Sequence, residues 1–220
     1  MNVLEMTAEE ILALTPEQYT TLSNEEIHYI EYVRSAMRDV AMKNKLKESI
    51  SKGDWSDFCE MLTISSRQVM EEYFIKYYDQ VPDELKYDLV TDLYICVGDS
   101  IPAVRKALRG ALKYGKATLP PELEGLNEIT VYRGGTEDIG KATYRISWTL
   151  SRDKAEWFAN RNCLAGFPYH LYKGVIRRDK IIAYTNRREE EEIMQYRNVR
   201  KIEELPFISE NDKNARKLAV

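Results

Sequence analysis

Apolar residues in the first half of the chain follow the spacing of helices. From Ile27 onward they recur three or four positions apart, which places them on one face of a long helix. Gly53 ends this pattern, and the same spacing predicts further helices over about 55–79, 83–96 and 102–114. The apolar residues expected on the long helix are Ile30, Val33, Met37, Val40 and Ala41.

Three start signals lie in the first 24 residues. Thr7 and Ser23 are each followed three residues later by a glutamate, which is the spacing of a capping box. Thr15 is followed by Pro16, and proline suits the first helical position because the N–H that it lacks would have no helical partner there. We therefore expect helices to begin directly after Thr7, Thr15 and Ser23.

The pattern changes after Pro120-Pro121, where short runs of β-branched and aromatic residues replace the helical spacing. One helical pattern lies among them, at Arg152–Asn160. Several strands with distant partners and one or two helices indicate an α+β fold. We expect a helical region over residues 1–120 and an α+β domain over 121–220. The expected strands are Ile129–Arg133, Tyr144–Thr149, Leu171–Ile176, Ile181–Tyr184 and Glu190–Tyr196.

The composition is that of a soluble globular protein, with 31% charged and 44% hydrophobic residues among 220. No segment is apolar over the length of a membrane-spanning helix. Met1–Leu14 alternates acidic and apolar residues where a signal peptide would be basic and then apolar. We therefore expect a cytoplasmic protein that does not contact a membrane.

Cysteine and histidine are scarce. Cys59, Cys96 and Cys163 are odd in number and far apart, which argues against a disulfide framework and against a zinc site. His28 and His170 are the only two imidazoles, so a Ser-His-Asp site is also disfavoured. We expect chemistry that needs no metal.

The net charge of −4 is distributed unevenly along the chain. Residues 1–128 hold 14 basic and 23 acidic residues, whereas residues 129–188 hold 12 basic and 5 acidic residues. Residues 189–220 hold 6 basic and 8 acidic residues. The β-rich segment is therefore basic within an acidic protein, and we expect it to contact something anionic.

The first candidate motif is Val131-Tyr132-Arg133-Gly134-Gly135, an arginine near the end of an expected strand followed by two glycines. A guanidinium presents a rigid fork of donors suited to phosphate, and glycines let a ligand approach the backbone closely. Taken alone, a tight turn beside an ion-paired arginine explains the same residues.

The second motif is Ser147-Trp148-Thr149, which precedes a helix that we expect Ser151 to cap. Ser147 and Thr149 lie two residues apart, so both side chains point to the same face of the strand. Hydroxyl groups at these two positions either orient a carboxylate or only disrupt the edge of a sheet.

The third motif is the acidic run Glu189–Glu192, which leads into Ile193-Met194. A run of like charges usually forms a solvated face. If this one enters a strand, alternation places Glu190 and Glu192 on one face. Two carboxylates on one face of a sheet suit acid, base or cation-stabilising roles.

The order of the three motifs resembles the Arg…Ser-Thr-Ser…Glu-x-Glu arrangement of the mono-ADP-ribosyltransferases, in the branch that includes cholera-toxin-like and clostridial C3-like toxins. The resemblance covers residues 129–196 and does not extend to residues 1–120. It implies a two-sheet β core with few helices, NAD+ as co-substrate, and transfer of ADP-ribose to a macromolecule.

The resemblance also implies a role for each motif residue. Arg133 would hold the NAD+ phosphates and brace the site, and Ser147 would form a hydrogen bond with the catalytic Glu192. Glu190 would help to activate the acceptor. The resulting expected NAD+-binding residues are Arg133, Gly134, Ser147, Thr149 and Phe158.

Two positions depart from the family pattern, because Trp148 replaces the middle threonine and Thr149 replaces the last serine. Trp157, Phe158 and Tyr132 are candidates for an apolar wall beside nicotinamide, although core packing is the more common role of such residues. Because position 148 is a tryptophan, this chain has no middle hydroxyl group.

The chemistry suits these residue types. Cleavage of the nicotinamide–ribose bond develops positive charge on the ribose, as in glycoside hydrolysis. A fixed carboxylate such as Glu192 would stabilise that charge, and Arg133 would pair with the pyrophosphate.

The sequence does not identify the molecule that accepts ADP-ribose. Thr185-Asn186-Arg187-Arg188 corresponds to the loop that helps such enzymes recognise their target, and Glu190 favours a protein arginine. The net charge of residues 129–188, which is +7 from 12 basic and 5 acidic residues, favours RNA or DNA as the acceptor instead. We place a protein side chain ahead of a nucleic-acid base.

The sequence also permits two functions other than ADP-ribose transfer. The chain would be an NAD+ glycohydrolase if water were the acceptor, or a non-catalytic interaction protein if the helical half only bound a partner. The acidic helical half would recognise a target, pack on the basic half, or receive an antitoxin or inhibitor. The resemblance implies an intracellular toxin or effector of a bacterium or phage, including the toxin of a toxin–antitoxin pair.

Overall fold

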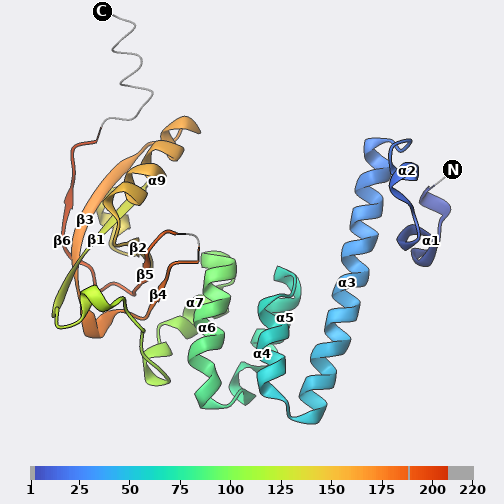
Figure 1. Ribbon diagram of the computed structural model, residues 1–220, viewed down its shortest axis with the longest axis horizontal. Helices are drawn as coiled ribbons and strands as arrows, with labels where there is room; N and C mark the ends of the chain where they lie inside the picture. Colours follow the sequence, from blue (N-terminus) through green and yellow to red (C-terminus); the bar gives the residue numbers. More distant parts are fainter. Residues whose placement is uncertain (1–2, 188, 208–220) are drawn as a thin grey trace, which may run out of the picture. The chain divides into compact units, whose positions relative to one another are not determined.

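The computed structural model (Figure 1) describes residues 3–187 and 189–207. The chain forms two compact units, Met1–Ala107 and Leu108–Val220. Pro120-Pro121 lies inside the second unit, where Pro121 begins the short 3-10 helix η5 (Pro121–Leu123). Each unit is described by itself below.

The first unit is helical. It begins with η1 (Val3–Glu5), α1 (Ala8–Leu12), α2 (Pro16–Tyr19) and the long α3 (Asn24–Lys52). The expected starts are confirmed, since Thr7, Thr15 and Ser23 each cap a helix with a complete capping box. In the box at Thr15, Gln18 is the residue that reaches back to the cap.

Gly53 ends α3 with φ of 69°, a left-handed conformation that glycine adopts without strain. The helical stretch expected over 55–79 is two helices, α4 (Trp55–Thr63) and α5 (Arg67–Tyr77). The break occurs because Ser66 caps α5 through the backbone N–H of Val69. The unit continues with η2 (Tyr78–Gln80), α6 (Asp83–Val97), η3 (Gly98–Ser100) and α7 (Pro102–Leu108).

The N-terminal elements close over the start of α3 with a small core of their own. Its buried residues are Val3, Ile11, Leu14 and Ile30. Within the described residues, no helix combines the length and the apolar character needed to cross a membrane.

The second unit contains six strands in one antiparallel sheet, in the order β4-β5-β2-β1-β3-β6 (Figure 1). The α+β fold class is therefore confirmed. The strands are β1 (Glu128–Gly135), β2 (Ser147–Thr149), β3 (His170–Arg177), β4 (Ala183–Thr185), β5 (Glu192–Met194) and β6 (Arg200–Glu204). The other elements are η4 (Ala111–Lys113), α8 (Ile139–Ala142), α9 (Arg152–Leu164) and η6 (Arg178–Lys180).

The two sheets implied by the family resemblance are not separate in this chain. The groups β4-β5-β2 and β1-β3-β6 join through a single pair of opposed residues, Tyr132 and Thr149. β2 is only three residues long, and it pairs with β1 at this one position. The described strands thus form one sheet that is weakly joined at its middle.

Three other differences concern the strands. Tyr144 and Arg145 lie in the turn after α8, where their N–H groups donate to the carbonyls of Lys141 and Ala142, so β2 begins only at Ser147. β4 begins at Ala183, two residues later than expected. The sequence did not predict β6.

The two faces of the sheet are covered differently. α9 lies across β1 and β3 (Figure 1), on the face to which Gly134 belongs. On the opposite face, Trp148 and its cross-strand partner Ile193 are buried in an apolar core with Val131. This arrangement leaves the α9 face of β1, β2 and β5 as the floor of a pocket.

Candidate functional site

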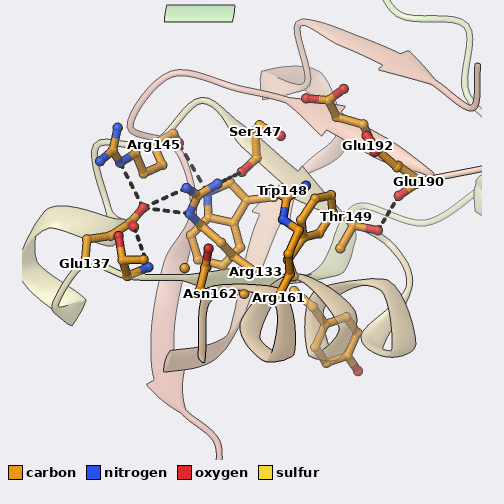
Figure 2. Close-up of a pocket in the computed structure, with 15 residues that line it drawn as sticks. Arg133, Glu137, Arg145, Ser147, Trp148, Thr149, Arg161, Asn162, Glu190 and Glu192 are labelled. Carbon is orange, nitrogen blue, oxygen red and sulfur yellow. Dashed lines mark hydrogen bonds and ion pairs between the residues drawn. The ribbon is translucent and has the colours of Figure 1, made fainter. Parts of the chain in front are cut away.

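A pocket of about 390 Å³ opens in the second unit between α9, β1, β2 and the glutamate run (Figure 2). Its lining draws on segments that are up to 60 residues apart in the sequence, from Tyr132 to Glu192. All the site residues expected from the sequence line it: Arg133, Gly134, Ser147, Thr149, Phe158, Glu190 and Glu192.

Three hydrogen bonds hold the guanidinium group of Arg133 at the wall of the pocket. Its Nε and Nη2 donate to Oε1 of Glu137 at 3.0 and 2.7 Å, and its Nη1 donates to the carbonyl oxygen of Ser147 at 2.6 Å. These contacts use three of the five N–H groups of the guanidinium. Arg133 therefore links β1 to β2 and keeps donors for a ligand.

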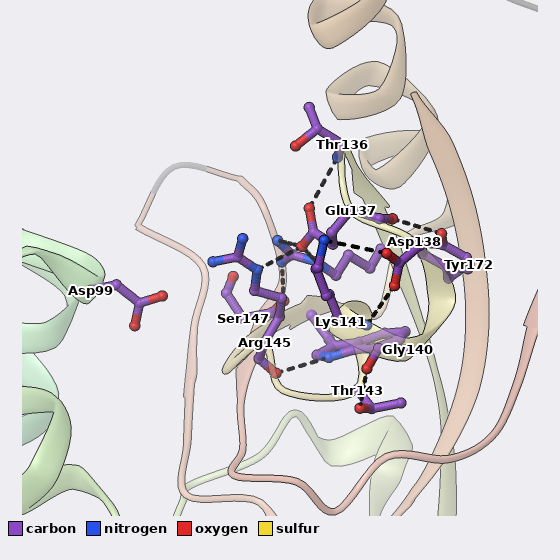
Figure 3. A network of polar contacts seen from close by, with 12 residues as sticks. Asp99, Thr136, Glu137, Asp138, Gly140, Lys141, Thr143, Arg145, Ser147 and Tyr172 are labelled. Atoms are coloured by element: carbon purple, nitrogen blue, oxygen red, sulfur yellow. Dashed lines mark hydrogen bonds and ion pairs between the residues drawn. The ribbon is translucent and has the colours of Figure 1, made fainter. Parts of the chain in front are cut away.

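Glu137 is the anionic centre of this network (Figure 3). Besides Arg133, its Oε1 pairs with Nε of Arg145 at 2.8 Å, and its Oε2 accepts from the backbone N–H of Thr136 at 3.0 Å. Its own carbonyl oxygen accepts from the hydroxyl of Tyr172 at 2.7 Å. One buried carboxylate thus orients two guanidinium groups beside the pocket.

The pKa of Glu137 reflects two opposed effects. Burial raises it, but the charge and hydrogen bonds of Arg133, together with Arg145, hold the pKa below its ordinary value. Glu137 is consequently ionised at neutral pH, and the network of one carboxylate and two guanidinium groups has a net positive charge.

Ser147, Thr149 and Glu192 share one face of the sheet. Thr149 lies directly opposite Glu192 in the β2–β5 pair, and Ser147 lies on the adjacent diagonal, opposite Met194. Opposed residues of an antiparallel pair point to the same face, and diagonal neighbours lie within reach of long side chains. The register therefore places Ser147, Thr149 and Glu192 on one face, where the Thr149 hydroxyl is directed to the carbonyl oxygen of Glu190 (Figure 2).

The glutamate run does not form the regular strand that was expected, because β5 begins only at Glu192. Glu189 and Glu191 have φ of 55° and 47°, which is uncommon for residues other than glycine. The bend is held by the Thr149 hydroxyl, which donates to the carbonyl oxygen of Glu190 at 2.6 Å. Leu150 N–H donates to the carbonyl of Glu191 at 3.0 Å. Glu190 nevertheless lines the same pocket as Glu192.

The two glycines of the first motif are explained by packing within the chain. A Cβ atom on Gly134 would lie 1.9 Å from the carbonyl oxygen of Ala155, so only glycine allows α9 to approach β1 this closely. A Cβ atom on Gly135 would lie 2.8 Å from Oε2 of Glu137. The glycines therefore set the position of α9 and of the Glu137 carboxylate.

Trp148 fits the structure despite departing from the family pattern. Its side chain lies on the core face of β2, and its Nε1 donates to the carbonyl oxygen of Arg145 at 3.2 Å. Since strand residues alternate between faces, a residue at 148 belongs to the core while 147 and 149 face the α9 side.

Five pocket residues were not predicted from the sequence: Thr136, Glu137, Arg145, Arg161 and Asn162. Arg161 lies one helical turn after Phe158 on α9, and its guanidinium carbon is 5.0 Å from the Phe158 ring centroid. That spacing of three was a usable signal. Of the aromatic candidates, Tyr132 and Phe158 line the pocket, whereas Trp157 is 53% exposed and lies outside its lining.

The loop expected to recognise a target contacts the glutamate run, although none of its described residues lines the pocket. Thr185 lies opposite Glu192 in the β4–β5 pair, and the side chain of Asn186 accepts from the backbone N–H of Glu191 at 3.1 Å. Arg187 follows on the exposed surface. Arg188, the last residue of the predicted loop, lies outside the described residues.

In Figure 2, Glu190 and Glu192 lie toward one end of the pocket, Glu137 and Arg145 lie toward the other, and Arg133 lies between them. Such a pocket suits a ligand that has an anionic group and, at some distance, a centre where positive charge develops. Among the described residues, no group of three or more His, Cys, Asp and Glu side chains is placed to hold a metal ion.

Comparisons with protein-family models, with curated proteins and with solved structures found no match to this chain.

Proposed function

We propose that the chain is an NAD+-dependent ADP-ribosyltransferase that acts on a macromolecular acceptor. The observation that supports this most is the shared pocket of Arg133, Ser147, Glu190 and Glu192. These residues come from three separate segments, and they are the ones that carry the resemblance to the mono-ADP-ribosyltransferases. A pocket assembled from all three motifs is the arrangement that the activity requires.

The cationic end of the pocket suits the pyrophosphate of NAD+. Arg133 keeps two of its N–H groups beyond those that bind Glu137 and Ser147. Arg145 is 42% exposed, and Arg161 adds a third guanidinium from α9. Guanidinium groups bind phosphate oxygens through two parallel donors, so this end would anchor the co-substrate.

The glutamate end suits the ribose attached to nicotinamide. NAD+ supplies the reaction chemistry: nicotinamide leaves C1′ of the ribose with the bonding electron pair, and a nucleophile of the acceptor forms the new bond there. The Glu192 carboxylate would stabilise the positive charge that develops on the ribose, and Ser147 would orient that carboxylate. Thr149 would act indirectly, because its hydroxyl holds the carbonyl oxygen of Glu190. Glu190 would accept the proton that the acceptor releases.

The direct test is transfer of label from NAD+ that is labelled in its adenylate half. We expect the full chain to label macromolecules in a cell lysate and the Glu192→Gln variant to label none. Glu189→Gln is the matched control, because Glu189 belongs to the same run but is exposed and outside the pocket lining. Its labelling should equal that of the wild type.

The fate of the label separates the remaining possibilities. Label that protease removes indicates a protein acceptor, and label that nuclease removes indicates a nucleic acid. Label found only in free ADP-ribose would contradict transfer and identify an NAD+ glycohydrolase. The absence of any NAD+ consumption would contradict both.

A further inference from the structure

Two arginines and two tyrosines alternate on the surface of the second unit. The guanidinium carbon of Arg197 is 4.4 Å from the ring centroid of Tyr144 and 5.4 Å from that of Tyr196. The guanidinium carbon of Arg109 is 4.5 Å from the ring centroid of Tyr196. We call these four residues the arginine–tyrosine surface.

No carboxylate of the described residues in the second unit pairs with the arginines of this surface. Among the described residues of the second unit, neither Arg109 nor Arg197 forms an ion pair, whereas Arg133, Arg152 and Arg177 each pair with a carboxylate. Arg109, Arg197 and Tyr144 are exposed, and Tyr144 keeps 48% of its surface accessible. Two cations and an aromatic ring are thus available to a ligand.

The arginine–tyrosine surface is connected to the wall of the pocket through a neighbouring residue in the chain and through hydrogen bonds. Tyr144 precedes the pocket residue Arg145, whose carbonyl oxygen accepts from Nε2 of Gln195 at 2.6 Å. The backbone N–H of Gln195 donates to the carbonyl of Ile146 at 3.0 Å, which fixes the turn that carries Tyr196 and Arg197. A polymer that binds the surface therefore lies beside the pocket.

We propose that the arginine–tyrosine surface binds single-stranded nucleic acid. Unpaired bases stack on tyrosine rings, and their phosphates pair with arginine, so one polymer uses the exposed ring of Tyr144 and the charges of Arg109 and Arg197. An acidic peptide would use the two charges but not the ring faces. A duplex would keep its bases stacked on one another.

The charge of the second unit agrees with this ligand. Residues 108–220 hold 21 basic and 16 acidic residues, a balance of +5, whereas the whole chain has −4. Binding of a strand at this surface does not depend on the proposed transfer activity. Such a strand would lie beside the pocket whether it served as acceptor or not.

The test measures binding of fluorescein-labelled, mixed-sequence 12-nucleotide RNA and DNA to the full chain by anisotropy, without NAD+, at several salt concentrations. We expect the double variant R109Q/R197Q to raise Kd about tenfold or more. The slope of log Kd against log salt should fall by about 1.4, because two phosphate contacts are lost on a single strand. Tyr144→Leu should raise Kd about fivefold or more at an unchanged slope, because only base stacking is lost.

The matched control is R152Q/R177Q, which removes the same charge from two exposed arginines that pair with Glu156 and Asp179. We expect its Kd to stay within about threefold of the wild-type value, and melting temperatures to show that all variants are folded. The inference would be overturned if the wild type bound no oligonucleotide, if the control weakened binding as much as R109Q/R197Q, or if duplex bound as tightly as single strands.

An acidic protein segment is the competing occupant. Binding of a polyglutamate peptide that R109Q/R197Q abolishes, without binding of any oligonucleotide, would assign the surface to such a segment and overturn the inference. Since no outcome here uses NAD+, failure of this inference is distinguishable from failure of the proposed transferase activity.

Discussion

The carboxylate of Glu137 is 5% exposed and contacts two guanidinium groups and one backbone N–H. Arg133 and Arg145 would repel one another without it, since both point toward the same carboxylate oxygen. A buried carboxylate with this many donors stabilises the fold only while it is ionised. The pocket and the stability of the second unit therefore depend on the same residue.

We expect Glu137→Gln to lower the free energy of unfolding by about 2 kcal/mol at pH 7, because it removes the charge that both guanidinium groups share. The pKa of Glu137 is lowered in the folded chain, so its contribution is present above the unfolded pKa and is lost as pH falls through the folded value. Urea unfolding at pH 7 and at about pH 3 should therefore show the difference between wild type and variant shrinking at acidic pH.

Glu156→Gln is the control for this measurement, because Glu156 pairs with Arg152 on the surface and such pairs contribute little. We expect a change within about 0.5 kcal/mol. An equal loss in both variants, or a loss for Glu137→Gln that does not depend on pH, would contradict the role assigned to the network.

Residues that belong to a sequence motif could be predicted as pocket residues, and residues that reach the pocket through folding could not. Arg133, Ser147 and Glu192 stand in recognisable local patterns, and all three line the pocket. Arg145 and Glu137 belong to no pattern, since their role arises from a contact between a turn and the end of a strand.

Local sequence determines the helix starts of this chain more completely than it determines the strands. The caps at Thr7, Thr15 and Ser23 act within four residues, so the sequence alone contains the information for where the helices begin. Strand pairing depends on distant partners. β6 (Arg200–Glu204) has one apolar residue, Ile202, and it is a strand because β3 offers a free edge. The bend at Glu189 and Glu191 likewise depends on contacts with β2 and its following residue.

The contact between β1 and α9 sets the width of the pocket, and Gly134 allows it. We expect Gly134→Ala to destabilise the chain by about 3 kcal/mol or more, because the new Cβ would lie 1.9 Å from the Ala155 carbonyl oxygen and 2.6 Å from the Ala159 nitrogen. Both obstacles are backbone atoms and cannot rotate away. Thermal or urea unfolding measures the loss.

Gly140→Ala is the matched control for Gly134→Ala. A Cβ atom there meets only the side chain of Asp138, at 3.3 Å, so the change should stay within about 0.5 kcal/mol. If Gly134→Ala were as stable as this control, the close approach of α9 to β1 would be wrong.

Charge and candidate site residues are divided between the two units. Residues 1–107 hold 11 basic and 20 acidic residues, a balance of −9, against +5 for residues 108–220. The pocket is lined from Tyr132 to Glu192 and lies wholly in the second unit. The helical unit is therefore not required to build the pocket.

We expect a fragment of residues 108–220 to fold and to release nicotinamide from NAD+ at a rate within about tenfold of the full chain, because its core and every pocket residue are its own. Circular dichroism and a nicotinamide assay check both statements. A folded fragment without activity would mean that residues 1–107 contribute to the site.

We propose that the Glu192 carboxylate stabilises the positive charge that develops on the ribose of NAD+. The most direct measurement is the rate of nicotinamide release by the purified chain, its Glu192→Gln variant and its Glu189→Gln variant. We predict that Glu192→Gln lowers the rate about 100-fold or more, as removal of a preorganised electrostatic group commonly does, and that Glu189→Gln leaves it unchanged. Nicotinamide release by Glu192→Gln at the wild-type rate would contradict this role of Glu192.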